Sequence, residues 1–195
     1  MGEYYHIYNR GVDKRNIFSS VRDYNRFILL LYLCNSKKQV DLGSLLRNEG
    51  RSFADILQMD RGDNIVAIGS YVLMPNHFHV LVKEISENGI SKFIGKLSKG
   101  YSMYFNKKNK RIVSLFEGRF KATHANKNEY LRYLFSYIHL NPMKLIDSDW
   151  KINGIRNVKA AERYLIDYRY SSYLDYFGVS RMENRRRYSS HCSVS

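Results

Sequence analysis

Cysteine and proline are scarce in this chain, and long apolar runs are missing. Its 195 residues include 2 cysteines and 2 prolines. Cys34 and Cys192 are far apart, and Cys192 lies in an arginine-rich tail, so neither a disulfide framework nor a cysteine metal site is expected. No apolar run reaches the roughly 18 residues of a membrane span. The opening MGEYYHIYNRG lacks the apolar centre of a signal peptide. We therefore expect a soluble, intracellular protein with no membrane partner.

Acidic residues are also in short supply. The chain has 32 Lys and Arg against 18 Asp and Glu, a formal net charge of +14. Such an excess favours a polyanionic partner, because each neutralised phosphate releases condensed counterions. Solubility alone, or an anionic membrane surface, would also fit the charge. The 17 tyrosines and 10 phenylalanines favour nucleic acid, since aromatic rings stack on unpaired bases.

Apolar periodicity predicts alternating strands and helices. Strands are expected at 6–11, 65–74, 77–85 and 116–125, and helices at 19–35, 90–111 and 128–142. Residues 36–63 are mixed and polar and are interpreted as an insertion with a short helix around SFADILQM. The order βαββαβα indicates an α+β, ferredoxin-like (split βαβ) fold, whose antiparallel sheet packs helices on one face.

The expected organisation is one main domain with two C-terminal additions. The domain covers residues 1–150, with the insertion at about 36–63. A C-terminal extension, 151–178, contains YRYSSYLDYFG and is expected to pack on the domain. The basic segment 179–195 has almost nothing to bury, and we expect it to be a disordered tail.

The segment MPNHFHVLV, residues 74–82, places two histidines in the second strand of a predicted hairpin. Successive strand side chains point to opposite faces, so His77 and His79 share one face while Phe78, Val80 and Val82 share the other. Two imidazoles on one face can bind a divalent ion, but a metal site needs further ligands. The alternative is simply a polar strand face.

A tyrosine and an asparagine lie one turn apart on the predicted helix 128–142. Tyr137 and Asn141 are at i and i+4 and share a helical face. The Asn141 oxygen would suit Mg²⁺ or Mn²⁺ and complete a set of two imidazoles and one oxygen. Tyr137 would then stand beside a metal able to polarise a phosphate. Alternatively, Tyr137 is a half-buried core residue and Asn141 a helix terminator before Pro142.

These residues together resemble a known family. HFH looks like the HUH motif, in which U is a bulky apolar residue, and YLFSYIHLNPMK resembles the single-tyrosine helix of the Y1 (IS200/IS605-like) transposases. The closer resemblance is to their REP-associated tyrosine transposase branch. YHIYNRG, SLFEGRFKA and SSYLDYFG agree as well, so the resemblance covers most of residues 4–178 and is weakest over the insertion.

The resemblance implies a fold of the HUH-endonuclease type and a cytoplasmic, prokaryotic enzyme. The implied activity is a metal-dependent endonuclease and strand transferase of single-stranded or hairpin DNA. By the same resemblance, His77, His79 and Asn141 bind Mg²⁺ or Mn²⁺. Tyr137 attacks the scissile phosphate, leaving a free 3′-OH and a 5′-phosphotyrosine. Whether the enzyme is a monomer or a homodimer stays open, because both occur among such transposases.

Two points of the chemistry stay open in the sequence. A tyrosine is a weak nucleophile at its usual pKa of about 10, so we expect activation by the metal, with the proton acceptor undetermined. Two other functions also fit the residues: a non-catalytic protein that binds hairpin DNA or RNA, and a metal-dependent hydrolase that uses water and not Tyr137.

Basic and aromatic side chains between residues 96 and 121 are candidates for binding the DNA strand. They are Lys96, Lys99, Tyr104, Lys107, Lys108, Lys110, Arg111, Arg119 and Lys121.

Overall fold

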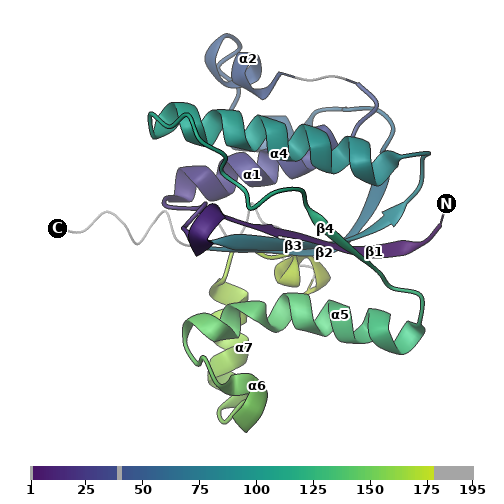
Figure 1. Ribbon diagram of the computed structural model, residues 1–195, viewed down its shortest axis with the longest axis vertical. Coiled ribbons are helices and arrows are strands. Elements are labelled where there is room, and N and C mark those ends of the chain that lie inside the picture. The colour runs from purple at the N-terminus through teal and green to yellow at the C-terminus, as the bar shows by residue number, and fades with distance from the viewer. Residues whose placement is uncertain (1, 39–40, 178–195) are drawn as a thin grey trace.

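The computed structural model describes residues 2–38 and 41–177 (Figure 1). Its strands are β1 (Tyr4–Arg10), β2 (Val66–Met74), β3 (His77–Glu84) and β4 (Lys121–His124). Its α-helices are α1 (Val21–Cys34), α2 (Leu42–Arg47), α3 (Phe53–Gln58), α4 (Gly89–Lys108), α5 (Asn128–Leu140), α6 (Trp150–Asn153) and α7 (Val158–Asp167). Short 3₁₀ helices lie at Val12–Lys14, Asn141–Leu145 and Tyr173–Phe177.

The strands form one antiparallel sheet in the order β2-β3-β1-β4. β1 and β3 are the two central strands, as in a split βαβ fold. The predicted α+β, ferredoxin-like class is thus confirmed. The MetProAsn turn joins β2 to β3, and the Pro75 carbonyl accepts hydrogen bonds from the backbone N–H groups of Ile17 and Phe18. The segment after β1 therefore holds the turn that precedes the histidine pair.

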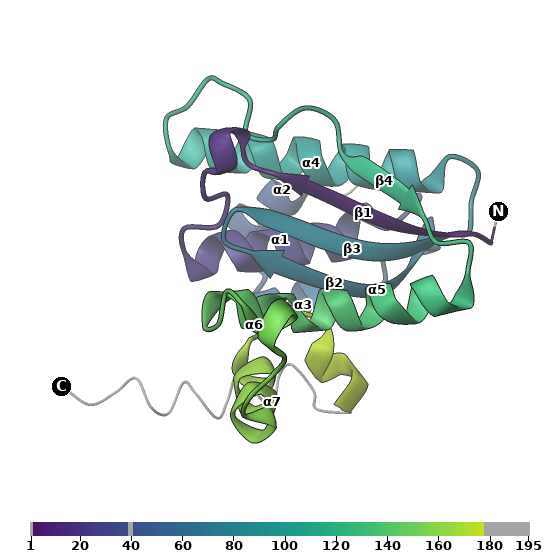
Figure 2. The same cartoon turned by 60° about the horizontal axis from the view of Figure 1, so that its bottom comes forward.

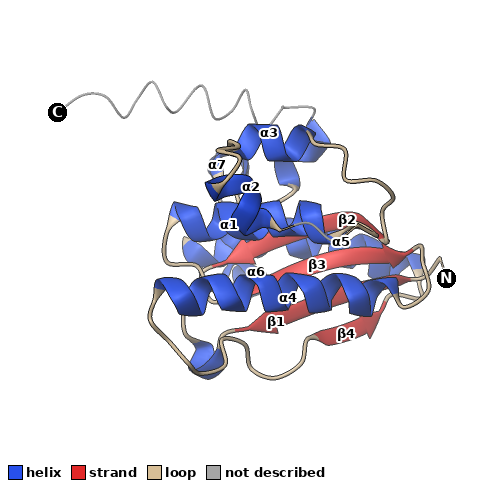
Figure 3. Ribbon diagram, turned by 90° about the horizontal axis from the view of Figure 1, so that it is seen from above, coloured by secondary structure: helices blue, strands red, loops and turns tan. Residues whose placement is uncertain are grey.

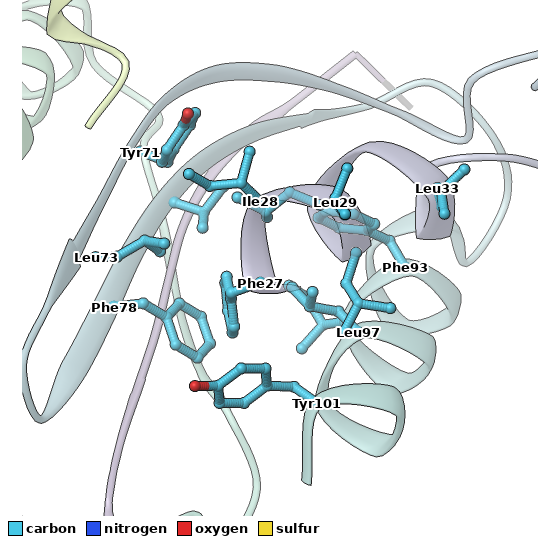
Figure 4. Close-up of a cluster of buried hydrophobic side chains, with 14 of the residues drawn as sticks. Phe27, Ile28, Leu29, Leu33, Tyr71, Leu73, Phe78, Phe93, Leu97 and Tyr101 are labelled. Carbon is cyan, nitrogen blue, oxygen red and sulfur yellow. The ribbon is translucent and has the colours of Figure 1, made fainter. Parts of the chain in front are cut away.

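Helices α1 and α4 cover one face of the sheet and enclose the main core (Figure 3). The core-facing side chains of β3, among them Phe78 and Val80, are fully buried there. Figure 4 shows Phe27 of α1, Phe78 and Tyr101 of α4 meeting between the layers, with ring centroids 5.0 Å apart for Phe27–Phe78 and 4.9 Å for Phe27–Tyr101. Packing of these large rings sets the distance between the sheet and helices α1 and α4.

The expectation that all helices share one face is wrong for α5, which lies on the opposite face (Figure 1). Strands β2 and β3 present apolar side chains on both faces, as a sheet covered on two sides requires. Val72, Met74 and Leu81 point away from the main core and pack with Leu134 and Ile138 of α5. This second, smaller core positions α5 over the histidine side of β3.

The predicted insertion contributes to the main core. Leu42 and Leu45 of α2 and Ile56 of α3 are buried in it, so the polar segment carries enough apolar residues to cover the end of α1. The expected short helix is α3, and Ser52 and Asp55 close its N-terminus with a reciprocal capping box.

The predicted strand 116–125 is shorter than expected. Only Lys121–His124 form β4, although Phe116 makes an isolated bridge to Gly11. Gly118 has a φ of 71°, a left-handed conformation that interrupts an extended strand.

The segment before residue 178 extends the outer edge of β2. The Tyr170 carbonyl accepts a hydrogen bond from Leu73 N–H, and the Ser172 hydroxyl accepts one from Tyr71 N–H. These bonds satisfy backbone groups that an edge strand would otherwise expose. The domain boundary at residue 150 stays a prediction, and the expected tail 179–195 lies outside the described residues.

A buried carboxylate ties α1 to α4. Asp23 is 0% exposed and pairs with Lys108 Nζ at 2.7 Å. It also accepts hydrogen bonds from the Tyr104 hydroxyl and from Ser19 N–H. Burial by itself would raise the pKa of Asp23, but these hydrogen bonds together lower it below its usual value.

Replacement of Asp23 tests how much its carboxylate contributes to the stability of the fold. We expect Asp23→Asn to lower the free energy of unfolding at neutral pH by about 3 kcal/mol, because it leaves Lys108 without its charged partner. The folded-state pKa is below the unfolded value of about 3.9, so the contribution is complete above that pH and is lost as pH falls through the lowered pKa. Urea unfolding should show the difference from the native chain shrinking toward pH 3. An equal difference at pH 7 and pH 3 would contradict this.

Shortening a side chain to alanine should reduce stability by different amounts on the two faces of β3. Phe78→Ala removes a fully buried ring and should cost about 3–5 kcal/mol of unfolding free energy. The neighbouring change His77→Ala, on the opposite face where the side chain is only partly buried, should cost much less. Chemical denaturation of the two variants measures this difference, and similar losses would disprove the separation into a core face and a site face.

Candidate active site

The histidine pair lies on the side of β3 that faces α5. His77 opens the strand directly after the turn, and its Nδ1 lies 2.6 Å from Asn76 Oδ1. An amide oxygen only accepts, so His77 Nδ1 carries the hydrogen and donates it. The Asn76 side-chain amide in turn donates to the Lys14 carbonyl. The turn thus fixes the orientation of the His77 ring and leaves its Nε2 with a free lone pair.

A third histidine, which the sequence analysis missed, contacts the pair. His6 of β1 is buried, and its Nε2 lies 2.9 Å from His79 Nδ1. The two rings are stacked with centroids 5.0 Å apart. His6 shares a face of β1 with Tyr8, which pairs with His79 in the sheet register, and this register is not visible in the sequence.

All three imidazoles are neutral at physiological pH. Burial lowers the pKa of His6 and of His77 to about 4. Burial lowers the pKa of His79 to about 2, with further lowering from the neighbouring His77, His6 and two lysines. A neutral imidazole keeps the lone pair that a metal ligand needs, so no proton has to be displaced from these rings near pH 7.

Asn141 follows α5 and begins a 3₁₀ turn with Pro142 as its next residue. Its side chain is 0% exposed, and within the described residues neither amide atom has a hydrogen-bond partner. Asn141 lies close enough to His77 to raise the pKa of that imidazole, although burial outweighs the effect. A buried amide without partners is costly unless something else binds it.

Tyr137 is half-buried and contacts the histidines edge to face. Its ring centroid is 5.4 Å from that of His79 and 6.1 Å from that of His6, both at 77° between planes. The structure therefore brings His77 and His79 from β3 together with Tyr137 and Asn141 from α5 and its end.

Two lysines also lie at the tyrosine ring, and the sequence analysis did not single them out. Lys151 of α6 places its ammonium 4.1 Å from the Tyr137 ring centroid, and Lys144 places its own 5.8 Å away. Burial and the charge of Lys144 lower the pKa of Lys151. Lys144 stands three residues after Asn141, within the NPMK segment, whereas nothing in the sequence pattern marks Lys151.

The donor atoms at this site suit a hard or borderline divalent cation. Two neutral imidazoles and an amide oxygen without a partner form a set that Mg²⁺ or Mn²⁺ can accept, with water completing the coordination. Within residues 2–38 and 41–177, no three His, Cys, Asp or Glu side chains are grouped to hold a metal.

Most candidate DNA-binding residues lie away from this site. Helix α4, with Lys96, Lys99, Tyr104, Lys107 and Lys108, covers the opposite face of the sheet (Figure 3), and Lys110 and Arg111 follow its end. Some of these groups already have partners, because Lys96 binds the Ser36 carbonyl while Tyr104 and Lys108 bind Asp23. Lys121 is exposed on β4 and pairs in register with Tyr8, and Arg119 is exposed just before that strand. Their contact with DNA stays a prediction.

Comparisons with known proteins bear on the fold and the family. In the described part of the chain, no helix combines the length and apolar character needed to cross a membrane. No curated protein sequence gives a significant match. A solved structure of a REP-associated tyrosine transposase bound to a REP hairpin is similar in fold, with a TM-score of 0.53 and 14% identity, over 89% of this chain and 78% of that chain.

A family comparison matches most of the chain. The model of the IS200-like transposases matches residues 4–141, from the first residue of β1 to Asn141. This range covers the whole sheet, the histidine pair and helix α5 with Tyr137. The chain belongs to the IS200-like transposase family.

Proposed function

We propose that this transposase is a metal-dependent endonuclease and strand transferase of single-stranded DNA that uses Tyr137 as its nucleophile. The observation that carries the proposal is that Tyr137 of α5 and Asn141 at its end lie next to the histidine pair of β3. Tyr137 contacts His79, and Asn141 lies beside His77. Leu134 and Ile138 are the buried residues of α5 in the smaller core, and Tyr137 packs partly against them.

His77, His79 and Asn141 would hold the Mg²⁺ or Mn²⁺ ion. When bound, the ion draws negative charge off the scissile phosphate and makes the phosphorus a better electrophile. His77 already presents Nε2, because Nδ1 donates to Asn76. His79 presents Nε2 when its Nδ1–H donates to His6 Nε2, the arrangement in which metal-ligating histidines are usually held.

Tyr137 would supply the attacking oxygen. Its hydroxyl oxygen bonds to the phosphorus while the bond from phosphorus to the 3′ oxygen breaks. The proton that the phenol loses is balanced by the proton that the departing 3′ oxygen gains. The products are a 5′-phosphotyrosine and a free 3′-OH. Attack by a DNA 3′-OH reverses the step and joins strands without ATP, since the phosphodiester energy stays in the covalent intermediate.

Lys144 and Lys151 would balance the phosphate charge from the tyrosine side. Both ammonium groups lie within 6 Å of the Tyr137 ring centroid, at 5.8 and 4.1 Å. A phosphate at the tyrosine would thus lie between these cations and the metal ligands. Hairpin DNA is the substrate we propose, on the net charge of +14 and on the fold shared with a transposase that was solved with a REP hairpin.

Label transfer tests the nucleophile. With Mn²⁺ and end-labelled hairpin DNA from the flanks of the gene, the native chain should form a covalent adduct that survives a denaturing gel, and Tyr137→Phe should form none. Tyr32→Phe, on α1 across the sheet from the site, is the matched control and should form the adduct normally. If only DNA labelled at its 3′ end gives a labelled adduct, the protein is joined to the 5′ phosphate of the 3′ fragment.

Two other outcomes would contradict the proposal. DNA binding without an adduct would indicate a non-catalytic hairpin-binding protein, and cleavage by Tyr137→Phe would indicate a water-using hydrolase.

Metal titration tests the ligands independently of DNA. Loss of one protein ligand should weaken Mn²⁺ binding by about tenfold or more, since outer-shell changes alone cost 10- to 100-fold. We therefore expect His77→Ala, His79→Ala and Asn141→Ala each to raise the Mn²⁺ dissociation constant, measured by electron paramagnetic resonance. His124→Ala, on exposed β4, should bind Mn²⁺ as the native chain does. Unchanged affinity in Asn141→Ala would remove Asn141 from the ligand set.

A further inference from the structure

Three tyrosines form a row along α5 that ends at the proposed nucleophile. Tyr130, Tyr133 and Tyr137 follow the i, i+3, i+7 spacing of one helical face. Their ring centroids are 6.2 Å apart for Tyr130–Tyr133 and 5.9 Å for Tyr133–Tyr137, with only 16° and 24° between planes. The Lys151 ammonium continues the row beyond Tyr137.

Tyr133, the middle ring of the row, is not part of the protein core. Tyr133 is 57% exposed, while Tyr130 and Tyr137 pack only partly against the smaller core under α5. In the part of the chain that the structure describes, no hydrogen bond holds the hydroxyl of any of these three tyrosines. The Tyr133 ring therefore has an exposed face that a ligand could contact.

The row borders an open part of the sheet. Helix α5 lies along β2 and β3, and Figure 2 shows β1 and β4 uncovered on this face. Tyr137 is the end of the row nearest β1, because its ring contacts His6 of that strand. Lys121 and Thr123 of β4 are exposed beyond it, and Arg132 is exposed on α5 itself. Parallel rings and cations thus occur together beside the site.

We propose that this row is a stacking platform for unpaired bases of the DNA strand next to the scissile phosphate, with Tyr133 as its main contact. The inference rests on the proposed function, because it assumes that Tyr137 meets a phosphate. Single-strand binding combines rings that stack on bases with cations that follow the backbone, and it tolerates any sequence because every base has a π-face. Lys151 and Lys144 hold the backbone at the Tyr137 end, and Tyr133 and Tyr130 receive the bases that lead away from it.

The competing explanation is that the rings only stabilise α5. Aromatic side chains three or four residues apart support a helix by about 0.2–0.5 kcal/mol per pair without any ligand. That explanation predicts that the contribution of Tyr133 is independent of DNA bases.

The test is DNA binding in a chain that cannot react. In a Tyr137→Phe background without metal, fluorescence anisotropy compares a labelled oligothymidine with a strand of equal length built from abasic sugar phosphates. Tyr133→Leu should weaken binding to oligothymidine by about tenfold, and should leave binding to the abasic strand unchanged. Tyr133→Phe keeps the ring and should bind both strands as the background chain does.

Two results would overturn the proposal. One is unchanged oligothymidine binding by Tyr133→Leu, and the other is an equal loss for both strands, which would indicate a contact with the backbone or a structural effect. Failure of the proposed function is separable, because it appears as absent label transfer. If binding depends on bases through Tyr133 but the native chain never forms an adduct, the stacking platform is supported and the role of Tyr137 as nucleophile is disproved.

Discussion

The alternation of side chains along β3 is the constraint on which the rest of the structure depends. Phe78 and its alternate neighbours bury their side chains against α1 and α4, which forces His77 and His79 onto the opposite face. A shift of the strand by one residue would bury the imidazoles in the main core and expose the phenyl ring. The large apolar core on one side therefore fixes the metal ligands on the other.

The second core converts that face into a site. Leu134 and Ile138 pack α5 against the apolar residues of β2 and β3 that point away from the main core. Because of the helical period, Tyr137 then lies at His79 and Asn141 lies near His77. Burial keeps the imidazoles neutral, and it leaves the Asn141 amide without a protein partner among the described residues. The features that are costly for folding, neutral buried histidines and an unsatisfied amide, are those that a metal ion would use.

Apolar periodicity predicted the fold class, the long helices and the hairpin of β2 and β3, because these elements have regular patterns along single segments. The resemblance to a known family, and not spacing alone, singled out His77, His79, Tyr137 and Asn141, and their roles stay a prediction. The sequence did not place α5 on the second face, since a nearly unbroken apolar strand such as β2 does not show which helix covers which side. His6 and Lys151 reach the site only through tertiary packing, so no local pattern revealed them. The basic residues of α4 were expected near DNA, but charge alone does not show that Lys108 is paired with a buried Asp23.

A metal-activated tyrosine site is tested most directly by locating Mn²⁺ in crystals of the native chain soaked in this ion, from its anomalous scattering. We expect one strong peak bonded to His77, His79 and Asn141 and adjacent to Tyr137. A peak bonded to the histidines while the Asn141 side chain binds elsewhere would contradict the three-ligand site. A peak located away from β3, or none at all at saturating Mn²⁺, would contradict the claim that this face of the sheet is a metal-activated tyrosine site.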